Sequence, residues 1–288
     1  MDYKECVEWL YKCMPPFQMV GRSGYKPGMD SMRLLDAFLG SPHKNIKTIH
    51  VAGTHGKGSV CNNLCSILME DGNKVGLFTS PHLRDFRERI KVNGEMISEA
   101  EVCEFVETYR TFLEALLPSF FEVTTAMAFW YFSRQKVDFA VIEVGLGGRL
   151  DSTNVISPLL SVVTNISYDH MNLLGDTLEK IAYEKAGIMK KNTPCVIGRA
   201  DGGVKRVFEE CAAQTEPKLY SVISRMLSTW ISQTIRLKTA IQCELRSKSC
   251  GSLATTCRMR LWSVVSPMCI ITLISQEDGR HCLPILLS

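Results

Sequence analysis

A glycine-rich segment between two regular patterns constrains this chain more than any other feature of its sequence. Gly53-Thr54-His55-Gly56-Lys57-Gly58-Ser59 follows a β-prone run at residues 46–51 and opens a helical pattern over residues 58–70. Its glycines let backbone N–H groups fold around phosphate oxygens, and the N-terminus of the following helix adds partial positive charge. The segment therefore predicts a strand, a phosphate-binding turn and a helix in direct succession.

The residue types in this segment match a compressed P-loop. Lys57 is placed to reach the β- and γ-phosphates of a nucleotide, and the hydroxyl of Ser59 to reach Mg²⁺. A turn that merely connects a strand to a helix is the alternative, but such a turn does not require Lys-Gly-Ser at these positions. We therefore expect ATP and Mg²⁺ as cofactors, with ATP bound by Thr54, His55, Gly56, Lys57, Gly58 and Ser59.

The chain up to residue 225 alternates apolar runs with helical patterns. Further strands are expected at residues 74–79, 139–144, 160–164 and 194–197, and a hairpin with Asn93-Gly94 at its turn at 89–97. Helices are expected at 98–117 behind a capping box, at 124–135, and from a cap at Asp176 through Lys185. This alternation predicts an α/β fold, with a mostly parallel P-loop-type sheet covered by helices on both faces. Ligands of such sheets bind at the carboxyl ends of the strands.

Charged side chains follow the later strands. Glu143 ends the apolar run at 139–144, where a carboxylate is costly unless it is paired or bound to a cation. Mg²⁺ prefers such an oxygen ligand, although an ion pair of Glu143 with Arg149 is the alternative. Taken alone, His170 is more typical of a structural residue that is held by hydrogen bonds. Taken alone, Lys185 is more typical of an ordinary surface lysine.

The composition excludes several classes of protein. The hydrophobic share of 45% and the charged share of 22% are near globular averages, and the net charge of +3 is too small to indicate nucleic acid or a membrane surface. No apolar run reaches the roughly 18 residues that span a bilayer. The acidic N-terminus differs from a signal peptide, and the twelve cysteines lack a CxxC pair and are interpreted as buried thiols. We expect a soluble, cytoplasmic monomer.

The pattern changes near Met226. Residues 227–288 contain seven basic and three acidic residues, five of the twelve cysteines and only two of the twenty glycines. They show no turn punctuation and no sustained period, whereas local and global signals normally agree in an evolved sequence. We therefore divide the chain into a domain at 1–225 and an irregular, atypical tail at 226–288. Our hypothesis is that the original reading frame is lost near Met226; a poorly patterned but genuine domain is the alternative.

Five motifs occur in one order along the first 225 residues. They are the glycine-rich segment, Thr79-Ser80-Pro81-His82-Leu83, residues 143–154, Asp169-His170 and residues 184–188. Together they resemble the folylpolyglutamate synthase/dihydrofolate synthase family, a branch of the Mur ligases. The resemblance implies an ATP-dependent ligase that joins L-glutamate to the carboxylate of a folate or dihydropteroate through an acyl phosphate.

The resemblance also implies roles for individual residues. Ser80 and Glu143, with Ser59, are expected to hold one Mg²⁺, His170 a second, and Lys185 to be carbamylated. Lys57, Glu143, His170 and Lys185 form the expected catalytic set. The expected pterin site comprises Ser119, Phe120, Phe121, Glu122, Leu150, Asp151 and Ser152. An aromatic face such as Phe121 and a bidentate carboxylate such as Glu122 suit a planar pterin.

Two departures from the family keep other functions open. His55 stands where folate members often have Asn, and nothing in residues 227–288 resembles the second α/β domain that supplies the glutamate site in the family. A non-catalytic nucleotide-binding fragment of the ligase is therefore one alternative. A cell-wall Mur ligase is another, although those enzymes carry Thr-Thr in place of Gly58-Ser59 and lack the Ser80-Pro81-His82-Leu83 signature.

Overall fold

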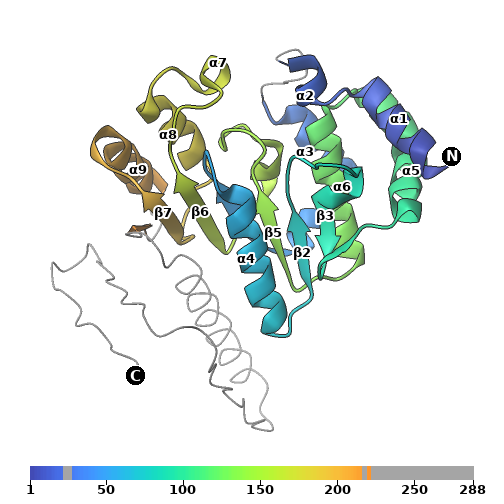
Figure 1. Cartoon of the computed structure of the whole chain (residues 1–288), viewed down its shortest axis with the longest axis horizontal. Helices are drawn as coiled ribbons and strands as arrows, with labels where there is room; N and C mark the ends of the chain where they lie inside the picture. The colour runs from blue at the N-terminus through green and yellow to red at the C-terminus, as the bar shows by residue number, and fades with distance from the viewer. Residues whose placement is uncertain (22–27, 216–218, 222–288) are drawn as a thin grey trace, which may run out of the picture.

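The computed structural model describes residues 1–21, 28–215 and 219–221, so the tail predicted at 226–288 lies outside the described residues. Within these described residues, eight strands form one sheet in the order β4-β3-β2-β5-β1-β6-β7-β8 (Figure 1). Their bounds are β1 Lys47–Ala52, β2 Val75–Phe78, β3 Ile90–Val92, β4 Glu95–Met96, β5 Phe139–Glu143, β6 Leu160–Asn165, β7 Cys195–Arg199 and β8 Leu219–Ser221.

The sheet is mostly parallel, as the sequence predicted. β1 lies between β5 and β6 with both pairings parallel, and β2, β7 and β8 continue the parallel part. Every residue of β2 and β5 is buried, which is typical of parallel strands that are covered on both faces. β3 and β4 form the predicted hairpin, whose turn residues Asn93 and Gly94 both have positive φ.

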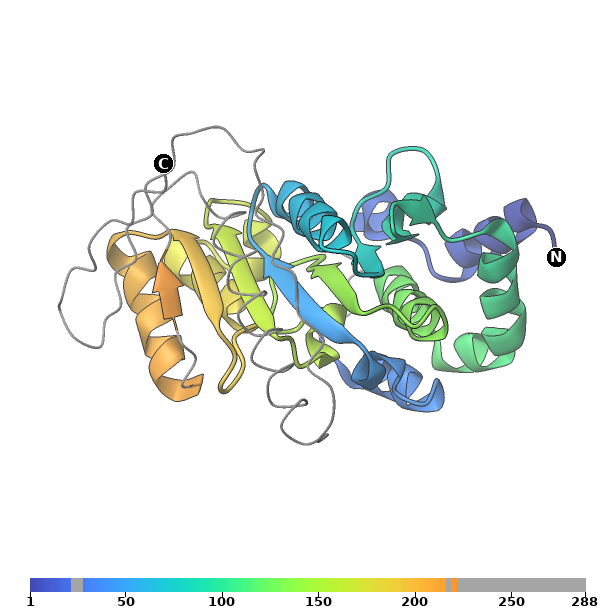
Figure 2. The same cartoon turned by 90° about the horizontal axis from the view of Figure 1, so that it is seen from below.

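Helices cover both faces of the sheet, which confirms the predicted fold class. α4 (Lys57–Glu70) packs on one face, against Ile49 and Val51 of β1 and Val141 of β5. On the other face α3 (Asp30–Phe38) and α6 (Phe120–Arg134) lie over β2 and β5, and α8 (Leu178–Ala186) and α9 (Gly202–Thr215) over β6 and β7. Figure 2 shows α4 on one side of the sheet and α3 and α9 on the other.

The helices not yet named surround this core. α1 (Tyr3–Cys13) packs against α5 (Glu99–Leu116), while α2 (Phe17–Val20) and α7 (Met171–Leu174) are short. The capping box predicted at Ser98 and Glu101 caps α5. The three N-terminal helices were not predicted, although Asp2 and Glu5 form a capping box at α1.

Two helix starts were predicted wrongly. α6 begins at Phe120 and not at Thr124, because Ser119 and Glu122 form a second capping box of the type that caps α5. α8 is capped by the Thr177 hydroxyl, which accepts from the Lys180 backbone N–H, whereas Asp176 instead forms an ion pair with the Lys180 ammonium at 2.7 Å.

All seven cysteines in the described part of the chain are free thiols. Cys6, Cys61, Cys65 and Cys195 are buried, as predicted, but Cys13, Cys103 and Cys211 are only half-buried. None of the described helices is both long and apolar enough to cross a lipid bilayer.

Candidate functional site

The glycine-rich segment connects β1 to α4 at the carboxyl edge of the sheet. Gly53 has φ +144°, and a Cβ on it would lie 1.8 Å from Thr164 Oγ1 and 3.1 Å from the Thr164 backbone nitrogen. Only glycine therefore allows the loop to pack so closely on β6. Gly56, with φ +77°, immediately precedes α4, so the left-handed turn into the helix also favours glycine.

Thr54 and His55 attach this loop to the end of β6 and to the residues that follow it. The Thr54 hydroxyl accepts from the Ser167 backbone N–H at 3.0 Å and donates to the Ser167 carbonyl at 3.2 Å. The His55 backbone N–H donates to Asn165 Oδ1 at 2.9 Å. Both residues thus set the shape of the loop, while Ser59 lies exposed in the first turn of α4.

Two lysines from distant parts of the chain share one acceptor. Lys57 Nζ donates to the Gly53 carbonyl at 3.1 Å and to the Thr54 carbonyl at 3.3 Å. Lys185, at the end of α8, donates to the same Gly53 carbonyl at 2.9 Å. Burial, and then the nearby Lys57 charge, lower the pKa of Lys185 to about 8. The structure therefore brings these two predicted residues together.

Glu143 ends β5 beside the same loop and is buried. Its Oε2 accepts from the Ser80 backbone N–H at 3.1 Å, and burial raises the pKa of its carboxyl group. The alternative ion pair with Arg149 is wrong, because Arg149 instead pairs with Glu184 at 2.8 Å. Glu143 is a buried carboxylate without a cationic partner within 4 Å in the described part of the chain.

A magnesium ion fits this place chemically. The Glu143 carboxylate and the hydroxyls of Ser80 and Ser59 are hard oxygen donors, which Mg²⁺ prefers. The described residues contain no cluster of three or more His, Cys, Asp or Glu side chains that could hold a metal. Mg²⁺ bound here would therefore depend on phosphate and water oxygens for its remaining ligands, as Mg²⁺ in nucleotide sites does.

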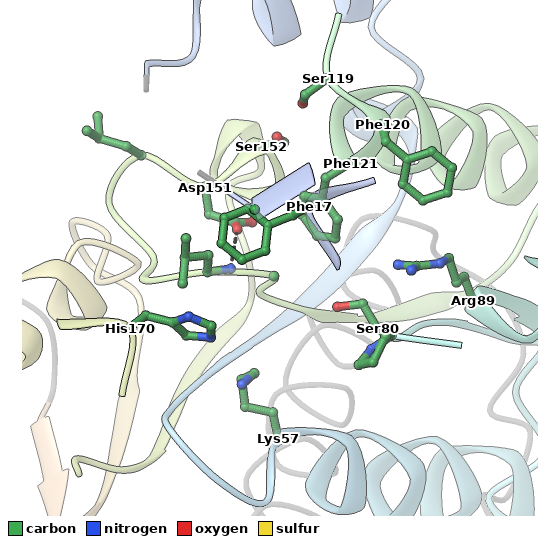
Figure 3. A pocket seen from close by; sticks show the side chains of 15 residues that line it. Phe17, Lys57, Ser80, Arg89, Ser119, Phe120, Phe121, Asp151, Ser152 and His170 are labelled. Carbon is green, nitrogen blue, oxygen red and sulfur yellow. Dashed lines mark hydrogen bonds between the residues drawn. The ribbon is translucent and has the colours of Figure 1, made fainter. Parts of the chain in front are cut away.

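A cavity of about 650 Å³ opens next to this edge, a volume typical of small-molecule sites (Figure 3). Lys57, Ser80 and His170 line one end, and the rings of Phe120 and Phe121 from α6 line the other. Phe17 of α2 lies between His170 and Phe121 in Figure 3. Its lining comprises Phe17, Gly21, Lys57, Ser80, Pro81, Arg89, Ser119, Phe120, Phe121, Gly145, Leu146, Leu150, Asp151, Ser152 and His170.

Six of the seven predicted pterin-site residues line this cavity, and Glu122 does not. Glu122 is buried, with Oε2 accepting from the Ser119 backbone N–H at 2.6 Å and Oε1 accepting from the Ser31 hydroxyl. Both oxygens are thus engaged in capping α6 and joining it to α3. Because Glu122 does not line the cavity, this geometry does not support the expected bidentate contact of its carboxylate with a pterin.

Asp151 provides the carboxylate that does reach the cavity. Its Oδ2 accepts from the Leu146 backbone N–H at 2.8 Å, and its Oδ1 from the Thr153 backbone N–H at 3.0 Å and from the Thr153 hydroxyl. His50 Nε2 lies 2.8 Å from that hydroxyl and is fully buried, and burial lowers its pKa to about 3. A neutral imidazole therefore supports the network that orients Asp151.

His170 lies across the cavity from Ser80 in Figure 3. It has φ +46° at the start of α7, its side chain is 43% exposed, and its ring meets Phe17 edge-on at a centroid distance of 6.1 Å. His170 Nε2 lies 3.6 Å from Asp169 Oδ2. His170 thus shares the cavity with Lys57 and Ser80, whereas the buried residues Glu143 and Lys185 are not among its lining residues.

Phe17 and Arg89 are among the lining residues that the sequence analysis did not assign to the site. Phe17 follows Pro15-Pro16 on the short α2, and Arg89 ends the 3-10 helix η3 (Phe86–Arg89). Neither position carries a local signal that separates it from neighbouring residues of the same type. Arg87, for example, occupies the same turn as Arg89 but faces Asp85.

Comparison with known proteins agrees with the geometry. The family model described as Mur ligase middle domain matches residues 51–249. A dihydrofolate synthase/folylpolyglutamate synthase of Bacillus subtilis is 47% identical over 201 residues, which cover 67% of this chain and 45% of the relative. This chain thus spans about half of the length of that curated relative.

Solved structures show the same likeness. Folylpolyglutamate synthase from Thermotoga maritima is 43% identical, with a TM-score of 0.68 over 76% of this chain and 49% of that chain. E. coli FolC, in complex with DHPP and ADP, is 32% identical, with a TM-score of 0.67 over 77% of this chain and 51% of that chain. Because the family model matches more than half of its length, this chain belongs to the Mur ligase family through the middle domain.

Proposed function

We propose that this chain performs the ATP-dependent activation step of a folylpolyglutamate synthase/dihydrofolate synthase, in which L-glutamate is ligated to a folate or dihydropteroate carboxylate. The observation that carries the proposal is the convergence of a P-loop lysine, Lys57, with Ser80 and an aromatic wall around one cavity. A polyphosphate suits the first end of this cavity and a planar heterocycle the second. The E. coli relative is solved in complex with DHPP and ADP, which supports a site for two ligands.

The first step of such a reaction joins two anions, since the acceptor carboxylate attacks the γ-phosphate of ATP. Glutamate amine then displaces phosphate from the acyl phosphate. The chain's task in the first step is to neutralise and position charge, as in other phosphoryl transfers. Lys57 and the N–H groups at the start of α4 would hold the phosphates, and magnesium, when bound, would supply further positive charge near Glu143 and Ser80.

Lys185 suits carbamylation, which we propose for it. A carbamate forms when a neutral amine adds to CO₂ and loses a proton, so a lysine with a pKa of about 8 presents far more reactive amine at neutral pH than an ordinary lysine. Carbamylation would turn the cation beside Lys57 into an anion. The two ammonium groups that now share the Gly53 carbonyl would then become an ion pair.

At the aromatic end, we propose that the pterin lies against Phe121 and Phe17, with Asp151 as its hydrogen-bonding carboxylate. Asp151 replaces Glu122 in this role because its side chain lines the cavity. Leu150 and Ser152 flank it, and Ser119 and Phe120 complete that side of the wall. His170 remains the proposed ligand of a second magnesium.

The decisive experiment measures phosphate release by the 288-residue chain with ATP, Mg²⁺, L-glutamate and either dihydropteroate or tetrahydrofolate. Release that requires the acceptor supports the activation step, and a further requirement for glutamate supports complete ligation. ATP binding without acceptor-dependent release would instead indicate a non-catalytic nucleotide-binding fragment. Release that requires a sugar nucleotide in place of a pterin would indicate a cell-wall ligase.

Lys57→Ala tests the charge-neutralising role. We expect phosphate release to fall by at least about 100-fold, because Lys57 is the P-loop cation that faces the phosphate end of the cavity. The matched control is Lys44→Ala, on the 3-10 helix at Pro42–Asn45, away from the cavity. Release by Lys57→Ala within about threefold of the parent chain would contradict the assignment, provided that the circular dichroism spectrum is unchanged.

The free thiols are consistent with a reducing compartment. The cytoplasmic location and the monomeric state nevertheless stay predictions.

A further inference from the structure

Arg89 is a buried cation in the wall of the cavity. It ends η3 directly before β3 and is only 2% exposed. In Figure 3 its guanidinium extends from the edge of the cavity towards the space between Ser80 and Phe121. Arg89 is therefore hidden from bulk water but faces the ligand space.

The partners of Arg89 within the described residues carry no charge. Its Nε donates to His82 Nδ1 at 2.7 Å, and its Cζ lies 5.2 Å from the centroid of the Phe120 ring. Since His82 Nδ1 accepts this bond, the ring proton is on Nε2, which lies 3.1 Å from the Tyr11 hydroxyl. Burial and the Arg89 charge lower the pKa of His82, which keeps the imidazole neutral.

No carboxylate of the described residues lies within ion-pair distance of Arg89. Glu143 acts on it only from beyond 4 Å, and burial lowers the pKa of Arg89 to about 10, so the guanidinium stays charged at neutral pH. Arg87 shows the ordinary arrangement two residues earlier, with Nη2 2.8 Å from Asp85 Oδ2. A buried guanidinium without such a partner is costly, and an anion that enters the cavity would offset the cost.

We propose that Arg89 binds the carboxylate of the acceptor substrate and holds it between the phosphate end and the aromatic wall of the cavity. The inference rests on the proposed function and names a substrate-positioning group for it. A planar guanidinium fork matches a carboxylate, and its Nη atoms remain available because Nε is held by His82. The position of its Cζ over the Phe120 ring places this charge beside the aromatic part of the ligand space, whereas Lys57 lines the phosphate end.

The test is calorimetric titration of the 288-residue chain with pteroate and with the same pterin carrying aniline in place of aminobenzoate. The two probes differ only in the carboxylate. We expect the unsubstituted chain to bind pteroate about 30-fold more tightly than the analogue, as one charge-assisted hydrogen-bond pair implies. In Arg89→Met the dissociation constant for pteroate should rise about 30-fold, while that for the analogue should stay within about threefold.

Arg87→Met is the matched control and should leave both dissociation constants unchanged, because Arg87 lies outside the cavity lining. Arg89→Lys keeps the charge without the fork, so its loss should be smaller than that of Arg89→Met and confined to pteroate. Titration with a non-hydrolysable ATP analogue verifies that each variant is folded. The two-probe comparison on the unsubstituted chain needs no variant at all.

Equal affinity of the unsubstituted chain for both probes would overturn the role of Arg89, and so would an equal loss of both probes in Arg89→Met. If Arg89→Met bound the ATP analogue more weakly but pteroate equally well, Arg89 would be a phosphate-binding residue. That result would also overturn its role in binding the acceptor carboxylate. Failure of the unsubstituted chain to bind either probe would overturn the proposed function together with this inference.

Discussion

At the scale of single residues, the site is defined by charges whose compensation is incomplete. Lys57 and Lys185 donate to one carbonyl, that of Gly53, and Glu143 is buried with only the Ser80 N–H bound to its Oε2. Each arrangement costs free energy, because like charges repel and buried charges lose hydration. Such groups gain most when a charged ligand, a metal ion or a modification compensates them.

Lys185 carries the prediction about pH. With a pKa of about 8, roughly a tenth of its amine is neutral at pH 7 and most of it at pH 9, so we expect carbamate formation to rise over this interval. The measurement is the carbamate carbon signal in nuclear magnetic resonance spectra recorded with ¹³C-labelled bicarbonate. Lys185→Met should remove the signal.

Lys190→Met provides the control for that measurement. Burial also lowers the pKa of Lys190, which donates to the Asn154 carbonyl at 3.1 Å. It lies outside the cavity lining, so its replacement should leave the carbamate signal intact. A signal that survives Lys185→Met and disappears in Lys190→Met would refute the assignment.

At the scale of elements, the same type of capping box begins two helices that have different roles. Ser98 and Glu101 cap α5, and Ser119 and Glu122 cap α6 with the same reciprocal hydrogen bonds. The first helix packs against α1, whereas the second begins with the rings that line the cavity. The α6 cap thus contributes to helix stability and also positions Phe120 and Phe121.

Ser119→Ala and Ser98→Ala separate these two contributions. Each removes one capping hydroxyl and should lower the free energy of unfolding by about 1 kcal/mol in urea titrations. Only Ser119→Ala should also weaken pteroate binding, because only α6 begins in the cavity wall. Equal affinity of both variants for pteroate would show that the α6 cap has no part in shaping the site.

At the scale of the whole molecule, the site exists because the sheet brings separate loops to one edge. The loop after β1 packs on the end of β6 through Gly53 and Thr164, and it is tied there again through Thr54 and Ser167. The Ser80 backbone, which follows β2, is held by Glu143 at the end of β5. Contacts between residues more than sixty positions apart therefore determine the geometry of the site.

Gly53→Ala tests the closest of these contacts. The new Cβ would lie 1.8 Å from Thr164 Oγ1, which is a clash. The alanine would also have to keep the backbone φ of +144°, which strains any residue except glycine. Gly40→Ala is the control, because Gly40 has φ +79° with no atom within 4 Å of its added Cβ. We expect Gly53→Ala to lower the free energy of unfolding by about 2 kcal/mol more than Gly40→Ala does. Equal losses would mean that the loop moves away from β6 without cost.

Elements of secondary structure that depend on residues close together in the sequence could be predicted from the sequence alone. The strand, turn and helix around residues 46–70, the Asn93-Gly94 hairpin and the parallel sheet follow from periodicity, glycine placement and capping patterns. These signals act over a few residues, so the sequence displays them directly. The capping role of Ser119 and Glu122 was equally local, but the sequence analysis assigned both residues only to the pterin site and therefore placed the start of α6 too late.

Features that depend on distant neighbours required the folded chain. Nothing in the sequence around Arg87 and Arg89 says which guanidinium meets a carboxylate and which faces the cavity, because the strand that follows and the packing of Phe120 decide it. The shared acceptor of Lys57 and Lys185 is likewise invisible along the chain, since 128 positions separate the two lysines. Burial and charge compensation are properties of three-dimensional surroundings, and those surroundings turn ordinary residue types into a site.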